Sequence, residues 1–330
     1  MKPKRSNFVL REDISKLLQE DSSYSIDQLN EKSSIIYCKD TKNITSDVGK
    51  LVQDKNKSSL IVPSYISTDD ECLKKLISYG DDVALTLFYE EEYPGTEINQ
   101  VSSQFLKEIE IDIKETAQSY EDAGSKEISE TYLSCIPIFQ EAAKKMLESY
   151  DRKIGTYLHD DSKDPFLFLL YIEVNMPGAC IKLHSDTNGA RTVISLANGG
   201  TIVSDSQYVD WVKWKETDGL LPVESVNWNP KEQLKNTRKW NNSLCKPQYQ
   251  LQVQTGDMLM MKGSMLTDNP CIHRAPYYAG DLEDNSRILI KLDFLPKSKI
   301  QAITESLGGG DESYMDTADD ISDSEEYEDF

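Results

Sequence analysis

Two stripes of apolar residues recur at three- and four-residue spacing between residues 102 and 151. The first stripe consists of Phe105, Leu106, Ile109, Ile113, Ala117 and Tyr120, and the second of Ile128, Tyr132, Ile136, Phe139, Ala143, Met146, Leu147 and Tyr150. Each stripe lies on an otherwise charged segment, as in helices that bury one face. Gly124 marks a turn between them. The pattern predicts two helices packed against a sheet, with no functional site on either.

Short apolar and β-branched runs, separated by glycine, proline and asparagine, follow from about residue 165 to residue 296. They read FLFLLYIEV, PGACIKLHSD, RTVISL, ANGGTIV, YQLQVQ, GDMLMMKG and SRILIKLDF. Their length and their turn signals are typical of a β-sandwich or barrel. Two further runs, SSLIVPSY and VALTLFY, predict strands in the first hundred residues.

These patterns predict an α+β fold in three regions. An α-rich α/β supporting region covers residues 1–164, a β-rich core covers residues 165–300, and residues 301–330 form a tail with too little apolar content to fold. Within the core, the polar insert 204–247 holds all four tryptophans. These tryptophans either pack as a small satellite core or belong to a lid over a binding site.

The formal net charge is −21, and residues 311–330 contribute ten acidic side chains without a lysine or arginine. An acidic body lacks the clustered cations that bind nucleic-acid phosphates or anionic membrane surfaces. We therefore expect no nucleic-acid and no membrane partner. The acidic tail suits a solvating role or the binding of a basic partner.

The chain has no apolar stretch near the ~20 residues of a membrane span. Its basic start, MKPKRSNFVL, leads into Arg11, Glu12 and Asp13 instead of a signal-peptide core. The six cysteines are scattered without a C-x-x-C pair, which favours buried or free thiols over a disulfide framework. These features together predict a soluble, cytoplasmic protein.

Two of the three histidines, together with one aspartate, occupy positions typical of metal ligands. His184 and Asp186 are two residues apart in KLHSDTNG, so both side chains share one face of a predicted strand. His273 lies in a second strand-like segment, PCIHRAPYY. Two imidazoles and one carboxylate form the facial triad of non-haem Fe(II) oxygenases, which leaves positions open for a cosubstrate and dioxygen.

Arg287 opens the run RILIKLDF, fourteen residues after His273. One face of that predicted strand carries the apolar side chains of Ile288, Ile290, Leu292 and Phe294. Arg287 therefore lies on the other face, together with Lys291. A buried guanidinium there can bind a carboxylate bidentately, and Lys291 is the competing anchor. Alternatively, both charges guard an edge strand against pairing with other chains.

An H-x-D pair, a distant histidine and an arginine soon after it resemble the iron(II)/2-oxoglutarate-dependent dioxygenases of double-stranded β-helix fold. The resemblance covers about residues 165–296, and GDMLMMKG, HRAP and RILIKLDF look even closer to an uncharacterised bacterial domain family of that kind. It implies a jelly-roll, cupin-like core in which His184, Asp186 and His273 ligate Fe(II). Arg287 would bind the distal carboxylate of 2-oxoglutarate. A small-molecule or protein substrate would be hydroxylated with dioxygen, with release of succinate and CO2.

Other interpretations stay open at this point. A non-oxidative cupin would hold zinc with the same three ligands and act as a metal sensor or carrier. An interaction protein with a vestigial barrel would act through its acidic tail. Cys180 and Cys271, which flank the two histidines, are expected to be small core residues, although a soft metal ligand is chemically possible. His159, in a polar segment, is expected on the surface.

Overall fold

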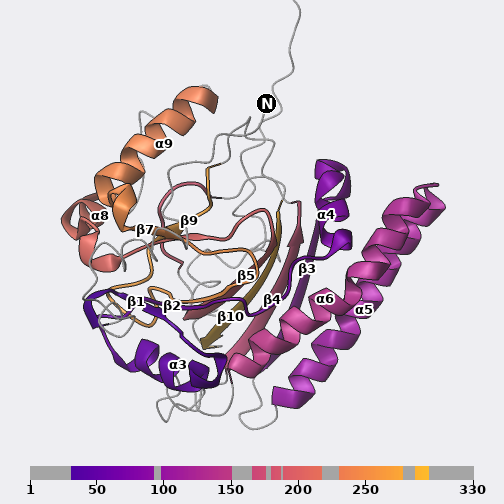
Figure 1. Cartoon of the computed structure of the whole chain (residues 1–330), viewed down its shortest axis with the longest axis horizontal. Helices are drawn as coiled ribbons and strands as arrows, with labels where there is room; N and C mark the ends of the chain where they lie inside the picture. The colour runs from indigo at the N-terminus through magenta and orange to yellow at the C-terminus, as the bar shows by residue number, and fades with distance from the viewer. Residues whose placement is uncertain are drawn as a thin grey trace, which may run out of the picture.

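The computed structural model describes residues 31–92, 98–150, 166–175, 180–186, 189–217, 230–277 and 287–296 (Figure 1). The predicted tail over residues 301–330 and His159 lie outside these residues. The strands are β1 (Ile35–Tyr37), β2 (Ser59–Val62), β3 (Leu85–Glu92), β4 (Phe166–Val174), β5 (Ala190–Ala197), β6 (Ile202–Ser204), β7 (Gln250–Gln252), β8 (Met258–Lys262), β9 (His273–Arg274) and β10 (Ile288–Pro296). The described α-helices are α3 (Ile44–Gln53), α4 (Glu71–Ser78), α5 (Ile98–Asp122), α6 (Lys126–Ser149), α8 (Trp211–Thr217) and α9 (Pro230–Leu244).

Seven strands form one large sheet in the order β1-β2-β8-β5-β10-β4-β3. β1 and β2 pair in parallel, and every other neighbouring pair in this order is antiparallel. Three of these strands come from residues 1–164 and four from the β-rich region, so the two regions share one sheet. The fold is a mixed α/β arrangement built on this sheet.

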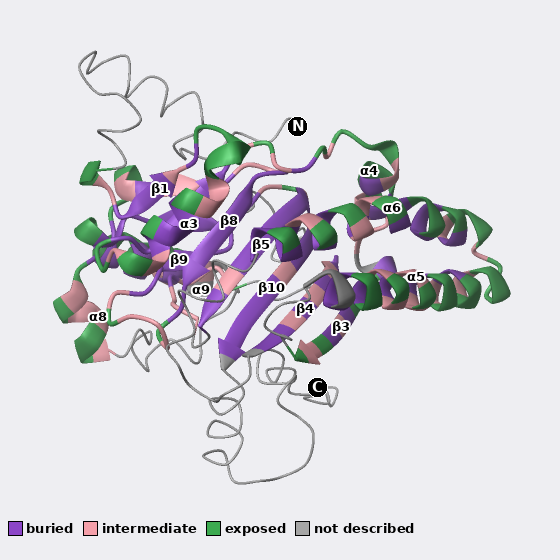
Figure 2. Ribbon diagram, turned by 90° about the horizontal axis from the view of Figure 1, so that it is seen from below, coloured by how far each residue is buried: buried purple, intermediate pink, exposed green. Residues whose placement is uncertain are grey.

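One face of the large sheet is an apolar surface that packs against helices. A row of side chains in direct register crosses six strands and consists of Leu87, Ile172, Ile290, Ile194, Met258 and Val62. All six belong to one hydrophobic core with the apolar stripes of α5 and α6, and the central strands are almost wholly buried (Figure 2). The predicted pair of helices and their packing on a sheet are thus confirmed.

The other face of the large sheet packs against a smaller sheet of order β7-β6-β9. Val203 of β6 shares a hydrophobic cluster with Val193 of β5 and Leu259 of β8, which joins the two sheets. Helices α8 and α9 lie at the outer side of the smaller sheet, on the opposite side of the molecule from α5 and α6 (Figure 1). Among the described helices, none is long and apolar enough to cross a bilayer.

The Trp-rich insert packs as a satellite core. Trp211, Trp214 and Trp240 lie in a third hydrophobic cluster that also contains Leu183 and Ile272. This arrangement matches the satellite-core interpretation for the three tryptophans, while Trp228 lies outside the described residues.

One predicted strand differs in the structure. The described part of PGACIKLHSD, residues 180–186, forms a single isolated bridge between His184 and His273. The prediction relied on β-branched and apolar content, which cannot show what lies on the other edge of the segment. That edge is bonded by the side chain of Asn241 on α9 instead of a strand.

We expect Ile290→Ala to lower the free energy of unfolding by about 2–5 kcal/mol, because Ile290 is fully buried in the centre of the apolar row. Urea denaturation measures the effect. The control is Ile111→Ala on α5, whose side chain is 42% exposed, and we expect a change within about 0.5 kcal/mol there. Equal effects of the two variants would contradict this account of the core.

Candidate metal centre

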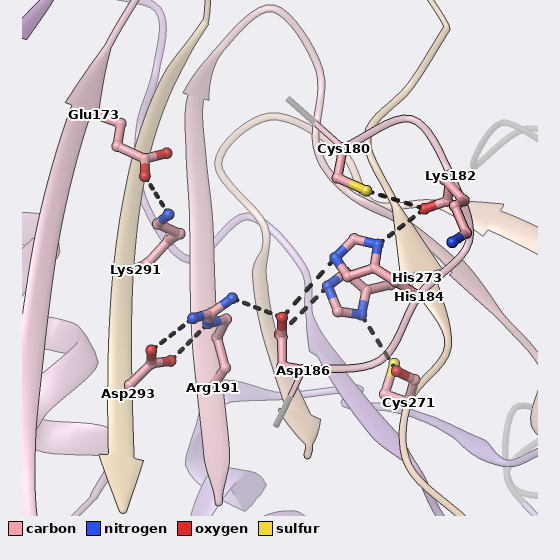
Figure 3. A network of polar contacts seen from close by, with 10 residues as sticks. All are labelled: Glu173, Cys180, Lys182, His184, Asp186, Arg191, Cys271, His273, Lys291 and Asp293. Carbon is pink, nitrogen blue, oxygen red and sulfur yellow. Dashed lines mark hydrogen bonds and ion pairs between the residues drawn. The ribbon is translucent and has the colours of Figure 1, made fainter. Parts of the chain in front are cut away.

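The backbone brings the two predicted histidine ligands together directly. His184 and His273 exchange both bridge hydrogen bonds, with N···O distances of 2.9 Å and 2.8 Å, and their ring centroids are 4.3 Å apart. Asp186 follows two residues after His184 and faces the same point (Figure 3). The structure therefore unites His184, Asp186 and His273, although 89 residues separate the two histidines in the chain.

Both imidazole rings are oriented in the same way. Nδ1 of His184 lies 2.9 Å from the carbonyl oxygen of Lys182, and Nδ1 of His273 lies 3.3 Å from that of Cys271. Because a carbonyl only accepts hydrogen bonds, each Nδ1 carries the proton and each Nε2 keeps a free lone pair. This is the arrangement that fixes the ring of a metal-binding histidine.

The two Nε2 atoms face the carboxylate of Asp186. His184 Nε2 lies 3.9 Å from Oδ1, and His273 Nε2 lies 3.4 Å from Oδ2. One ligand atom from each of the three residues can be chosen so that all lie within 4.8 Å of one another. Asp186 Oδ2 is buried and accepts no hydrogen bond from the described part of the chain.

Arg191 on β5 holds the second oxygen of this carboxylate. Its Nη1 lies 2.9 Å from Asp186 Oδ1, while Nε and Nη2 each lie 2.6 Å from the carboxylate of Asp293 on β10. Arg191 and Asp293 are direct partners in the β5–β10 register. A planar guanidinium can bridge two carboxylates in this way, whereas an ammonium cannot with the same geometry.

The electrostatics of the site favour the ligand forms of Asp186 and His273. Burial alone would raise the pKa of Asp186, but Arg191, His273 and His184 together lower it to about 2. Burial lowers the pKa of His273 to about 4, so its imidazole is neutral at neutral pH. For His184, burial opposes protonation, yet Cys180 and Asp186 raise the pKa of the ring.

The two predicted carboxylate anchors lie at different points of β10. Lys291 points to the inner face of the sheet, where it forms an ion pair with Glu173 of β4 and lies 5.1 Å from the ring of Tyr171. Arg287 is half-buried just before β10, and its carbonyl oxygen accepts a hydrogen bond from the backbone N–H of Asn175. The role of Arg287 stays a prediction.

The edge-strand interpretation of these two charges is wrong. β10 lies between β4 and β5 in the large sheet, so both of its edges are hydrogen-bonded to neighbouring strands. The sequence pattern could not show this, because a charged residue on the inner face of a central strand looks the same as one on an edge.

The two cysteines near the histidines differ from each other. Cys271 is buried in the cluster between the two sheets, as expected for a small core residue. Cys180 has an exposed side chain, and its Sγ contacts the carbonyl oxygen of Lys182 at 3.6 Å. Only the expectation for Cys271 is therefore confirmed.

Sequence reasoning missed three residues that shape the site: Arg191, Asp293 and Asn241. The available signal for Arg191 and Asp293 was a charged residue within an otherwise apolar strand. In RTVISL and RILIKLDF, strand alternation places this charged residue on the face opposite the apolar residues next to it. Asn241 lies in a polar helix and gives no such signal.

No protein-family model matches the chain, and no curated protein matches it either. Solved structures similar to it include the dioxygenase for auxin oxidation 1 from Arabidopsis thaliana, in a binary complex with 2-oxoglutarate (TM-score 0.35, 12% identity, covering 79% of this chain and 92% of that one). The dioxygenase for auxin oxidation from rice has a TM-score of 0.33 and 10% identity, with coverage of 81% and 90%. A Pseudomonas putida prolyl-4-hydroxylase has a TM-score of 0.30 and 11% identity, with coverage of 76% and 98%.

All three TM-scores lie below 0.5. The function therefore rests on the geometry of the site.

We expect Arg191→Leu to lower the free energy of unfolding by about 3 kcal/mol, because it leaves two carboxylates without their cation. This figure is at the lower end for a buried pair, since 21% of the Arg191 side chain is exposed. Arg191→Lys should lower the free energy of unfolding by less, because the lysine keeps the positive charge. Lys114→Ala, which removes an exposed ion pair with Glu110, is the control and should change stability by at most about 1 kcal/mol in the same urea titration. A fully stable Arg191→Leu would contradict the bridging role.

Proposed function

We propose that the chain is an Fe(II)- and 2-oxoglutarate-dependent oxygenase whose metal ligands are His184, Asp186 and His273. One observation carries the proposal: two Nε2 lone pairs and a buried carboxylate oxygen without a hydrogen-bond donor in the described part of the chain face one point. Leaving a buried carboxylate oxygen unsatisfied is costly unless a cation compensates it. Two imidazoles and one carboxylate suit a divalent transition metal and leave open positions on it.

The two packed sheets support a double-stranded β-helix core for this proposal. Such a core needs two largely antiparallel sheets that face each other across a shared interior. The large sheet and the β7-β6-β9 sheet share the cluster of Val193, Val203 and Leu259. His273 lies on β9 of the smaller sheet, and His184 is bridged to it. The metal ligands would then open into the space between the sheets.

When bound, iron and 2-oxoglutarate would supply the oxidising chemistry with dioxygen, and the protein supplies binding and orientation. Arg191 holds Asp186 Oδ1, which directs Oδ2 toward the ring of His273. The carbonyl oxygens of Lys182 and Cys271 hold the two rings in one tautomer. The apolar cluster between the sheets, which includes Leu289 of β10, keeps water away from one side of the interior.

We take Arg287 as the anchor of the distal carboxylate of 2-oxoglutarate, because a planar guanidinium can bind a carboxylate bidentately. Lys291, the competing anchor, forms an ion pair with Glu173 of β4. Arg287 precedes the same strand and falls in the same alternation as Lys291. The substrate is a small molecule or a protein side chain, and succinate release with a panel of metabolites and peptides is the measurement that finds it.

We expect His184→Ala and Asp186→Ala to abolish metal binding and to leave the far-UV circular dichroism close to wild type. Each residue supplies one of three ligands. Neither residue belongs to the hydrophobic core, so the fold should be retained. Anaerobic titration with Fe(II), followed by 2-oxoglutarate, measures both binding and the metal-to-ligand visible band. Full metal stoichiometry in either variant would remove that residue from the site. Tight zinc binding without any effect of 2-oxoglutarate would favour the zinc cupin instead.

We expect Arg287→Ala to weaken 2-oxoglutarate binding by roughly 30-fold to several thousand-fold, because it removes a charge-assisted bidentate contact worth about 2–5 kcal/mol. Arg287→Lys should recover part of the affinity, since an ammonium keeps the charge but lacks the planar fork. Isothermal titration of the iron-loaded proteins measures the effect. Bound iron should stay at the wild-type level.

The matched control for this prediction is Lys291→Ala on the same strand. If Lys291→Ala weakens 2-oxoglutarate binding and Arg287→Ala does not, Lys291 is the anchor. Loss of both metal and fold in Arg287→Ala would mark the arginine as structural.

A further inference from the structure

We infer that Asn241 positions the metal ligand His184 by serving as the missing strand partner of the segment that carries it. Asn241 lies on helix α9, in the insert 204–247 and outside the cluster of ligands. The inference rests on the proposed metal-dependent function. It assigns a positioning role to a helix that the sequence placed in a lid or a satellite core.

The side chain of Asn241 bonds the backbone as a neighbouring strand would. Its Oδ1 accepts a hydrogen bond from the N–H of Leu183 at 2.8 Å, and its Nδ2 donates one to the carbonyl oxygen of Ile181 at 2.9 Å. Residues 181 and 183 point their backbone groups to the edge opposite the one that His184 uses for His273. Both edges of the segment are therefore satisfied, although only one has a strand beside it.

The same amide also reaches the second ligand-bearing segment. Asn241 Nδ2 donates to the hydroxyl group of Tyr277, four residues after His273. Asn241 is fully buried, so surface water does not compete for these hydrogen bonds. One side chain thus ties together the two segments whose relative position sets the distance between the ligand rings.

Apolar packing against helix α9 also orients the two histidines. Leu183 and Ile272 immediately precede the two histidines, and both are fully buried in the cluster with Trp240 and Leu244 of α9. Successive side chains of an extended segment point to opposite faces. Because Leu183 and Ile272 point to α9, His184 and His273 point away from it, toward Asp186.

The substitution Asn241→Leu would keep the branched shape and the four side-chain heavy atoms and lose every one of these hydrogen bonds. The N–H of Leu183 and the carbonyl of Ile181 would then be buried without partners, and the segment would shift to reach other partners. Loss of a group that orients a metal ligand typically weakens metal binding roughly 10- to 100-fold. Asn241→Asp keeps the acceptor for Leu183 but turns a carboxylate oxygen toward the carbonyl oxygen of Ile181, so it should also weaken metal binding, by about tenfold or more.

The experiment compares wild type, Asn241→Leu, Asn241→Asp and Thr237→Val. Thr237 is buried one turn earlier on α9, so its substitution by the isosteric valine controls for disturbance of the helix. Anaerobic titration of the metal-free proteins with Co(II), read from its visible spectrum, gives the affinity and the coordination. Hydrogen exchange of the peptide covering residues 180–186 in the metal-free proteins reports how firmly the hydrogen bonds of Asn241 hold this segment when no metal is bound.

We expect faster exchange of that peptide and weaker Co(II) binding in both Asn241 variants, and neither change in Thr237→Val. Wild-type Co(II) affinity in a folded Asn241 variant would overturn the inference and leave the proposed function standing. Equal weakening in Thr237→Val would also overturn it, because any disturbance of α9 would then suffice. If the wild-type protein binds no Co(II), the proposed function itself fails, and the positioning role fails with it.

Discussion

The guanidinium of Arg191 joins the ligand cluster to the centre of the large sheet. It bridges Asp186, in the segment after His184, and Asp293, on the central strand β10. Without it, both carboxylates would lose this cation in a buried position. The bridge depends on the register of β5 and β10, which places Arg191 opposite Asp293. A slip of β5 by one residue would turn Arg191 to the face covered by helices and away from Asp293.

The large sheet carries two different surfaces on the same strands. Ile290 and Ile194 face the helices, while Lys291 and Arg191 on the same two strands face the smaller sheet. Strand alternation allows one face to supply the hydrophobic stability and the other to hold charges. Lys291 is compensated by Glu173, and Arg191 by Asp186 and Asp293, so these charges are not isolated in an apolar surrounding.

The insert is part of the architecture around the ligands. Trp211, Trp214 and Trp240 pack with Leu183 and Ile272, and these last two residues determine which way the adjacent histidines point. Helix α9 therefore covers the outer side of the smaller sheet, as α5 and α6 cover the outer side of the large sheet (Figure 1). The ligand segment itself is short and almost without regular pairing, so its position depends on these neighbours.

The sequence by itself determined the elements whose pattern is local. Helical spacing identified α5 and α6, alternation identified the two faces of β10, and the H-x-D spacing identified His184 and Asp186. Only the tertiary structure decided that β10 is a central strand, that Arg191 meets Asp293 across 102 residues, and that Leu183 meets Asn241 across 58. The physical reason is that periodicity reports which face of an element is buried, whereas a hydrogen bond or ion pair between distant segments depends on how whole elements dock.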